Sequence, residues 1–410
     1  MLKPNQNIKS IKNKKTLIST FSVCCSVFLF TIGQGATNPI LPILVQDLGA
    51  TTSMTGFVVG IFGAGRFLTN LPAGLVAQKI GIKPILVIGP AIASLGYYLT
   101  GYFDSTPLIL LSRLITGLGG GIHFVGAGIY LREISTLENR GRILSLQTIS
   151  ILTGQTIGPI IGGYIGEKYG LNSAFIFASI ALIIGIVLIL TTVIEPSVKK
   201  KNQTKNTNTQ KESLSNVILI FLKSGLIPIG LMTISTFFHR SGGRFTVAPL
   251  FIKYKGFTPS NIGTFFSITS LSQLTSSSIS GYLVDKLGRK TPIIPGVLII
   301  LISLFLFDKS DSNQMLLYVA ILFGLGEGLL NASTNTLFAD KAPKGYEGVT
   351  MGLLRTFGDL GFMIGPPILG FIIQKWNYRS ALITDGVILL VFSTLVILFT
   401  TETKGLKKNN

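Results

Sequence analysis

The sequence has little charge, two cysteines and two histidines. Only 12% of its 410 residues are charged, about half of the roughly 25% typical of soluble globular proteins. This scarcity argues against an ordinary cytosolic enzyme. Cys24 and Cys25 are adjacent in an apolar run, far from His123 and His239. Such a pair supplies neither a disulfide framework nor a zinc site of usual spacing, so we expect no metal and no cofactor.

Common catalytic motifs are also missing. The sequence has no Walker A pattern and no G-x-S-x-G elbow, which argues against ATP hydrolysis or covalent catalysis in this chain. We therefore do not expect an enzyme, and any energy for work would come from an ion gradient. After the lysine-rich residues 1–15, the apolar stretch continues without an A-x-A-like site. It is predicted to be a first span and not a cleaved signal peptide.

Long hydrophobic runs dominate what is present. Hydrophobic residues make up 47% of the chain, and the mean hydropathy is +0.59. A run of about 20 apolar residues can cross a bilayer as a helix, so the pattern predicts an all-α membrane protein with twelve transmembrane helices. The predicted spans are 18–41, 54–77, 84–102, 107–130, 143–165, 173–193, 226–250, 260–282, 291–307, 315–338, 350–373 and 380–400. A Lys-, Asn- and Thr-rich segment, 194–214, is predicted to link an N-terminal six-helix bundle (1–193) to a C-terminal one (215–410).

The charge that is present is mostly positive. The formal net charge of +19 would usually suggest a nucleic-acid partner, but so hydrophobic a chain offers no large basic water-facing surface. If both termini are cytoplasmic, 24 of the 35 Lys and Arg residues lie in cytoplasmic tails and loops and six in the opposite loops. Because positive residues stay on the cytoplasmic side, we expect a multi-pass cell-membrane protein with both termini cytoplasmic and no nucleic-acid partner.

The two halves repeat each other in sequence. Shifting the chain by 207 residues without a gap superposes Gly158 and Pro159 on Gly365 and Pro366, and the register holds for over 130 residues. Chance similarity between apolar segments does not keep one register for that distance. The chain is therefore predicted to consist of two six-helix pseudo-repeats that enter the membrane from the same side.

The loop after the span 260–282 carries a glycine- and charge-rich motif. It reads GYLVDKLGRKTP and contains the candidate gating residues Gly281, Asp285, Gly288, Arg289 and Lys290. This pattern resembles the loop signature of the major facilitator superfamily, and the two-repeat arrangement extends the resemblance over nearly the whole chain. The corresponding first-half loop is degraded, with Gln78 and Ile82 where the family has Asp and Arg, which puts a charge-based latch there in doubt.

Three further stretches resemble motifs of that superfamily: its second motif, the paired-proline motif of its twelve-span drug exporters and the motif of its drug/proton antiporters. Span 107–130 holds LLSRLITGLGGG, with Arg113 as an intramembrane arginine, and span 18–41 holds GQGATNPILP. Span 143–165 holds GQTIGPIIGG, the antiporter-type helix motif. Its members are Gly154, Gly158, Pro159, Gly162 and Gly163. The glycines on one stripe would let another helix pack closely, and an ordinary packing interface is the alternative interpretation.

Polar groups inside the spans are costly and usually functional. Glu327, Asn331 and Asn335 lie at i, i+4 and i+8 on one helical face. The resemblance places their span beside the transport path, so Glu327 is the first candidate for proton coupling. The alternative is a structural Glu327 paired permanently with an arginine of span 226–250 or 107–130.

The remaining candidates are less specific. Asp359 is a second proton-coupling candidate, with Arg113, but it can also form an i, i+4 ion pair with Arg355. Arg240 and Arg244 share a face, and either bind an anionic substrate or act as counterions for the acids. His239 is a candidate for the cavity and for relaying protons, although a lone histidine is usually just hydrogen-bonded. Gln34 and Asn38 are candidate substrate contacts, whereas Asp385 is expected at the membrane boundary, outside the site.

Together these features predict a secondary active transporter. The expected function is proton-coupled export of small amphiphilic compounds by alternating access, with protons, a small-molecule substrate and the lipid bilayer as partners, and with the chain acting as a monomer. The alternatives are proton-coupled uptake of a polar or anionic metabolite, and a non-transporting membrane sensor or scaffold. A sensor would ordinarily carry a soluble domain, for which the 21-residue linker and short tails leave no room.

Overall fold

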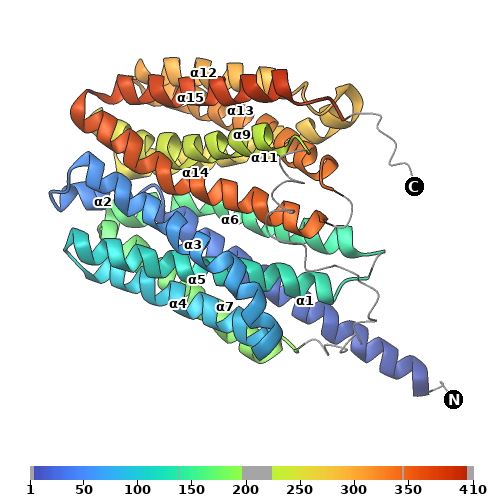
Figure 1. Ribbon diagram of the computed structural model, residues 1–410. Coiled ribbons are helices and arrows are strands. Elements are labelled where there is room, and N and C mark those ends of the chain that lie inside the picture. Colours follow the sequence, from blue (N-terminus) through green and yellow to red (C-terminus); the bar gives the residue numbers. More distant parts are fainter. Residues whose placement is uncertain (1–3, 137, 196–223, 344–345, 404–410) are drawn as a thin grey trace. The chain divides into compact units, whose positions relative to one another are not determined.

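The computed structural model describes residues 4–136, 138–195, 224–343 and 346–403, and in these ranges the secondary structure is helical, without strands (Figure 1). The first-half helices are α1 (Pro4–Thr37), α2 (Leu41–Asp47), α3 (Thr52–Ile80), α4 (Ile82–Tyr102), α5 (Thr106–Glu133), α6 (Arg140–Tyr169) and α7 (Leu171–Thr192). The second-half helices are α9 (Leu226–Phe238), η1 (His239–Val247), α10 (Ala248–Tyr254), α11 (Pro259–Leu287), α12 (Ile293–Asp308), α13 (Asn313–Asp340), α14 (Glu347–Lys375) and α15 (Tyr378–Phe399).

Each of the twelve predicted spans coincides with one helix or with consecutive helical segments. Within the described residues, seven helices are by themselves long and apolar enough to cross a membrane. The pair Thr52–Asn70 and Pro72–Ile80, which is bent by 47°, makes an eighth when it is counted as one span. Others have polar or glycine-rich stretches, such as the serines and threonines of α11. The all-α, multi-pass membrane architecture is thus confirmed, with helices in the twelve positions that the sequence predicts.

The helices form two compact units. Of the described residues, one unit takes those within Met1–Thr51, Phe57–Pro196 and Ile252–Ser267, and the other takes those within Thr52–Gly56, Ser197–Phe251 and Ile268–Asn410. The predicted linker, 194–214, lies outside the described residues except for its first two positions.

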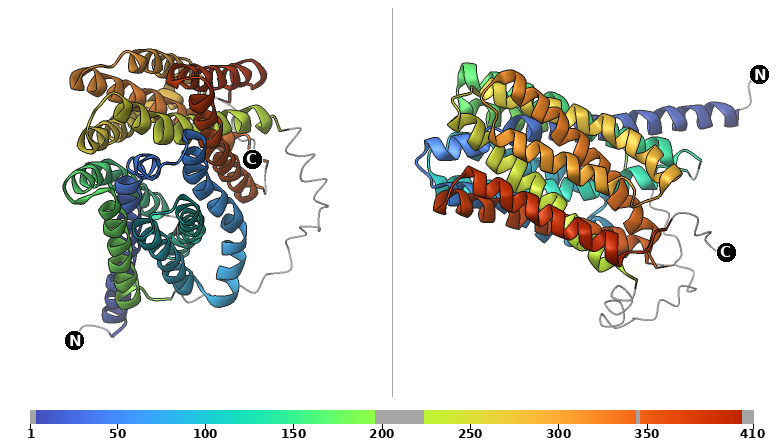
Figure 2. Two further views of the ribbon diagram at one scale, coloured as in Figure 1. Left: turned by 90° about the vertical axis from the view of Figure 1, so that its left-hand side faces the viewer. Right: turned by 90° about the horizontal axis from the view of Figure 1, so that it is seen from above.

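Helix packing inside the units follows the sequence repeat (Figure 2). In the first half, α4 packs against α5 and α7, and α1 packs against α6 and α7. In the second half, α12 packs against α13 and α15, while α9 packs against α14 and α15. Since these are the same pairs shifted by one repeat, the two halves are copies of one six-helix arrangement.

Candidate functional site

The helix of span 226–250 changes its winding where its charged residues lie. It runs as α9 to Phe238, continues as the π-helix η1 from His239 to Val247, and resumes as α10. The π segment contains Gly242 and Gly243, and glycine weakens α-helical preference. π-Helical turns are rare and frequently mark functional sites, so η1 is the first part of the second half to consider.

Glu327 of α13 faces this π-helix from inside the bundle. Its side chain is 2% exposed, and its Oε2 accepts a hydrogen bond from Arg244 Nη1 at 2.8 Å. Its other oxygen, Oε1, lies 3.8 Å from His239 Nε2. One buried carboxylate is therefore shared by two cationic or basic groups of η1, which compensates part of the cost of burying its charge.

Arg244 is itself held by α11. Its Nη2 donates to Ser270 Oγ at 2.7 Å and its Nη1 donates to Gln273 Oε1 at 3.2 Å. The guanidinium also lies 5.5 Å from the ring centroid of Phe245. Arg244 is therefore fixed in place beside Glu327, where a counterion of that carboxylate would lie. Arg240 is half-buried and lies 6.0 Å from the same ring.

Asp385 requires a correction. This residue was expected at the membrane boundary. It is instead only 1% exposed, and its Oδ2 lies 2.7 Å from His239 Nδ1. The physical reason is depth: α15 begins at Tyr378, so Asp385 lies two helical turns inside, about 10 Å along the axis. It occupies the buried stripe of α15, four residues from Ala381 and from Leu389, and this stripe is the sequence signal that could have identified it.

Next to this cluster lies a cavity of about 170 Å³. Asn331 and Asn335 line it from α13, one and two turns beyond Glu327. The full lining is Thr233, Thr236, Phe237, Asn331, Thr334, Asn335, Met351, Leu354 and Arg355. α13 thus carries an acid at one point and cavity amides further along the same helix. Arg355 contributes the cavity's cationic side chain, while Asp359, one turn further along α14, is fully buried.

The first-half candidates are buried in their own bundle. Arg113 is 1% exposed, and its guanidinium lies 5.0 Å from the ring centroid of Phe62 and 5.9 Å from that of Tyr97. Gln34 is 7% and Asn38 9% exposed. The geometry around Arg113 is a cation held between aromatic rings.

The antiporter-type motif lies where α6 packs against α1. A Cβ atom added at Gly154 would lie 2.8 Å from the Ile32 nitrogen, and one at Gly158 would lie 2.9 Å from the Ala36 nitrogen. Gly162 meets the Ala36 backbone in the same way. Only glycine permits this approach of the two backbones. The contact agrees with the predicted stripe of glycines on one helix face, and it equally fits an ordinary packing interface without a role in antiport.

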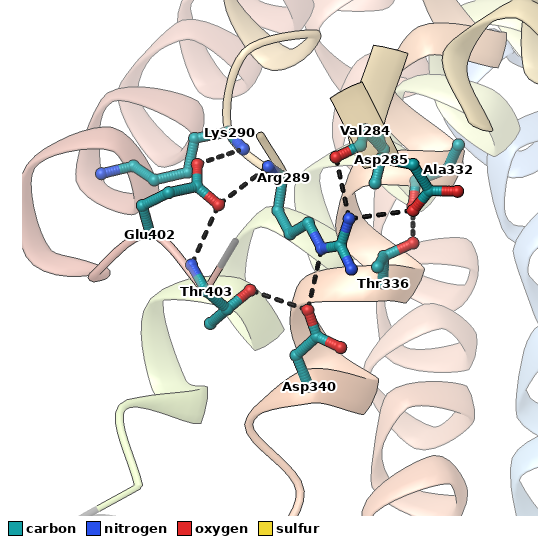
Figure 3. A network of polar contacts seen from close by, with 9 residues as sticks. All are labelled: Val284, Asp285, Arg289, Lys290, Ala332, Thr336, Asp340, Glu402 and Thr403. Carbon is teal, nitrogen blue, oxygen red and sulfur yellow. Dashed lines mark hydrogen bonds and ion pairs between the residues drawn. The ribbon is translucent and has the colours of Figure 1, made fainter. Parts of the chain in front are cut away.

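The predicted gating loop is the centre of a polar network that we call the α11–α12 turn network (Figure 3). Arg289 donates to Asp285 at 2.9 Å and to Asp340 at 3.0 Å, and Asp340 accepts from Thr403 at 2.8 Å. The hydrogen bond to Asp340 raises the pKa of Arg289 above its ordinary value. Gly288 has a φ of 127°, in a region that favours glycine.

Glu402 holds the backbone of the same turn (Figure 3). It accepts from the Arg289 nitrogen at 2.8 Å and from the Lys290 nitrogen at 3.0 Å. The first half has the matching contacts, because Glu195 accepts from the nitrogens of Ile82 and Lys83, both at 2.7 Å. Glu195 and Glu402 are 207 residues apart, so the turn support is duplicated although the charged motif is not.

Comparison with known proteins identifies the family of the chain. A family model described as Major Facilitator Superfamily matches residues 23–307 and 229–410. The chain belongs to the major facilitator superfamily.

Relatives within the superfamily include named resistance proteins. The chain is 25% identical to Multidrug resistance protein 2 of Bacillus subtilis over 393 residues, covering 93% of this chain and 95% of that protein. It is 24% identical to the Quinolone resistance protein NorA of Staphylococcus aureus, covering 87% and 89%. A crystal structure of a D-xylose-proton symporter shares the fold with a TM-score of 0.76 and 18% identity, covering 95% and 98%. The chain is thus a membrane transporter of this superfamily.

The sequence alone did not identify the roles of three acidic residues of this protein. Asp385 was placed outside the site, Asp340 was not connected with Arg289, and Glu402 was not considered. The position of Glu402 in the 207-residue register with Glu195 is a signal that could have singled it out. No local pattern indicates that Asp340 reaches Arg289, because the two residues are 51 positions apart.

Proposed function

We propose that this transporter is proton-coupled and exports small amphiphilic compounds in exchange for protons. The observation that carries the proposal is Glu327, a buried carboxylate whose Oε2 is paired with Arg244 at 2.8 Å and whose helix continues into the cavity at Asn331 and Asn335. The proposal includes alternating access by two six-helix halves, 1–193 and 215–410, joined by 194–214. It also includes a monomer in the cell membrane with cytoplasmic termini.

A proton is the natural ligand for such a carboxylate. Ionised Glu327 needs Arg244 nearby to offset the loss of hydration. Protonation removes the charge and weakens that pairing, which leaves Arg244 with Gln273 and Ser270. Because the acid and the cavity amides are on one helix, the protonation state of Glu327 and the occupancy of the cavity can influence each other through α13.

The cavity's lining supports an amphiphilic substrate. Phe237, Met351 and Leu354 give it apolar walls, and Asn331 and Asn335 provide polar groups that can orient a ligand. The names of the Bacillus and Staphylococcus relatives refer to multidrug and quinolone resistance, which favours export within this proposal.

A second candidate function is uptake of a polar or anionic metabolite with protons. Arg355 lines the cavity, so a cation faces any molecule bound there. Arg244 is less suited to this role, because its guanidinium already contacts Glu327, Gln273 and Ser270.

Proteoliposomes with an imposed pH gradient test the proposal. Candidate drugs and metabolites are added while internal pH is followed, with wild type, Glu327→Gln and the matched control Asp308→Asn, an acid of the same half that pairs with Arg379 at 3.7 Å. We expect wild type and Asp308→Asn to exchange compound for protons and Glu327→Gln to lose this coupling. If no compound moves protons through wild type, antiport is refuted, and normal coupling in Glu327→Gln would refute the assignment of Glu327.

A further inference from the structure

Three buried titratable side chains from three elements stand in a row in the second half. Asp385 of α15 contacts His239 of η1, with Oδ2 and Nδ1 2.7 Å apart, and the opposite ring nitrogen faces Glu327 of α13, with Nε2 and Oε1 3.8 Å apart. His239 is fully buried, and Glu327 and Asp385 are each 1% exposed. Within the described residues, Nε2 and Oε1 make no hydrogen bond.

The hydrogen bond to Asp385 determines what Nε2 can do. When Asp385 is ionised it can only accept, so Nδ1 carries the proton of a neutral imidazole and Nε2 has a free lone pair. That lone pair faces Oε1 of Glu327, the oxygen that Arg244 does not bind. Protonated Glu327 can donate to it once the two atoms approach by about 1 Å, to ordinary hydrogen-bond distance.

The π-helix makes this alignment possible. His239 and Arg244 are five residues apart, and in an α-helix such residues point about 140° away from each other. The wider π turn brings residues five apart towards one face, and here both contact the carboxylate of Glu327. Phe323, one turn before Glu327 on α13, stacks on the imidazole with ring centroids 5.5 Å apart and fixes its plane.

Gly243 keeps the far end of the row open. A Cβ atom there would lie 3.0 Å from Asp385 Cγ and 3.2 Å from His239 Nδ1. The carboxyl group of Asp385 therefore occupies space that any other residue at position 243 would restrict. The glycine at position 243 and the π-helical winding of η1 both favour the contact between Asp385 and His239.

We propose that Asp385 is the second proton-carrying group of this transporter and exchanges the coupling proton with Glu327 through His239. This inference rests on the proposed proton coupling. In the forward step, Glu327 gives its Oε1 proton to Nε2, and the imidazole gives its Nδ1 proton to Oδ2 of Asp385. One proton leaves Glu327, one arrives at Asp385 and His239 stays neutral, so charge and protons balance.

The relay also explains how Glu327 changes partners. Ionised Glu327 binds Arg244, whereas protonated Glu327 turns to His239. The charged groups that act on His239 are Asp385, Glu327 and Arg244, and α14, which also packs against η1, carries Arg355 and Asp359. A proton held at Asp385 is separated from Arg244 by His239 and Glu327, and it leaves the Glu327–Arg244 pair free to re-form.

Two transport assays separate a relay from a merely structural contact. Proteoliposomes containing wild type, Asp385→Asn, His239→Gln or Asp308→Asn are assayed for substrate uptake driven by a pH gradient and for substrate exchange at equal pH. The substrate is a compound from the tested drugs and metabolites that wild type exchanges across the membrane at equal pH. Asparagine at 385 still accepts the Nδ1 hydrogen bond but cannot take a proton. We expect Asp385→Asn and His239→Gln to lose at least tenfold in gradient-driven uptake while exchange stays within twofold of wild type, and Asp308→Asn to resemble wild type.

The outcomes are distinguishable. If wild type couples to protons and Asp385→Asn keeps its gradient-driven uptake, the relay is wrong while the proposed function stands. If Asp385→Asn loses both activities to the same degree, Asp385 only supports the structure, and thermal unfolding in detergent would show the accompanying loss of stability. If wild type shows exchange without proton-linked uptake, both the proposed function and the relay are refuted.

Discussion

Gly243 shows how one missing side chain arranges a polar cluster. It lies between His239, four residues earlier on η1, and Asp385 of α15, and a Cβ atom would lie 3.0 Å from Asp385 Cγ. The two polar residues are 146 positions apart in the chain. Their contact thus depends on a glycine that belongs to neither partner.

Gly243→Ala should displace Asp385 from His239. Because overpacking a tight contact costs about 1–3 kcal/mol, we expect a lower thermal unfolding temperature in detergent and a loss of proton-driven transport. Gly128→Ala is the control, since a Cβ at Gly128 of α5 has no neighbour within 4 Å. An unfolding temperature for Gly243→Ala equal to that of Gly128→Ala would contradict the steric argument.

The turns before α4 and α12 are supported in the same way by a glutamate three residues after the end of α7 and of α15. Glu195 accepts from the first two backbone nitrogens of α4, where an acidic group also complements the helix dipole. Glu402 does this for the turn before α12, where Lys290 Nζ also donates to the carbonyl of Thr400 at 2.7 Å. The second turn additionally has the Arg289–Asp340 ion pair.

Glu195→Gln and Glu402→Gln should therefore differ in effect. Each substitution removes charge-assisted hydrogen bonds to two backbone N–H groups, and loss of a comparable cap costs about 0.5–2 kcal/mol. We expect Glu195→Gln to lower the unfolding temperature more, because the first half has Ile82 at the position of Arg289 and so has no counterpart of the Arg289–Asp340 pair. Thermal unfolding of both variants in one detergent measures this, and a larger loss for Glu402→Gln would count against the argument.

At the scale of the whole molecule, the distribution of lysine and arginine predicts the orientation. Twenty-four of the 35 positive residues belong to the tails, the linker and the loops assigned to the cytoplasm. The segment 194–214 carries five of the lysines: Lys199, Lys200, Lys201, Lys205 and Lys211. These provide trypsin sites on one side of the membrane.

Trypsin added to sealed vesicles should cut this segment only when the cytoplasmic face is outside. We expect inside-out vesicles to yield two fragments of about half the chain, detected by antibodies against each half, because trypsin would also cut the lysine-bearing termini on that side. Right-side-out vesicles should protect the segment. Cleavage in right-side-out vesicles alone would reverse the predicted topology, which rests on the retention of positive charge in the cytoplasm.

Much of the architecture could be read from the chain before its structure. Hydrophobic runs predict helices because a backbone in lipid must satisfy its own hydrogen bonds, and the 207-residue register predicts the duplication that the packing pairs confirm. Glu327, Arg244 and the Asn331–Asn335 face were candidates for the same reason that makes buried polar groups costly. Their functional roles remain predictions.

By itself, then, the sequence determined the membrane-spanning helices, the two repeats and a short set of buried polar residues, because these follow from hydropathy, charge and spacing along the chain. Only the tertiary structure decided the partners. It brought Asp385 to His239, Arg289 to Asp340 and Glu402 to the turn before α12. Such contacts join segments that are far apart in the chain, and no local period encodes them. The π-helical winding of η1 then decides that His239 and Arg244 meet one carboxylate.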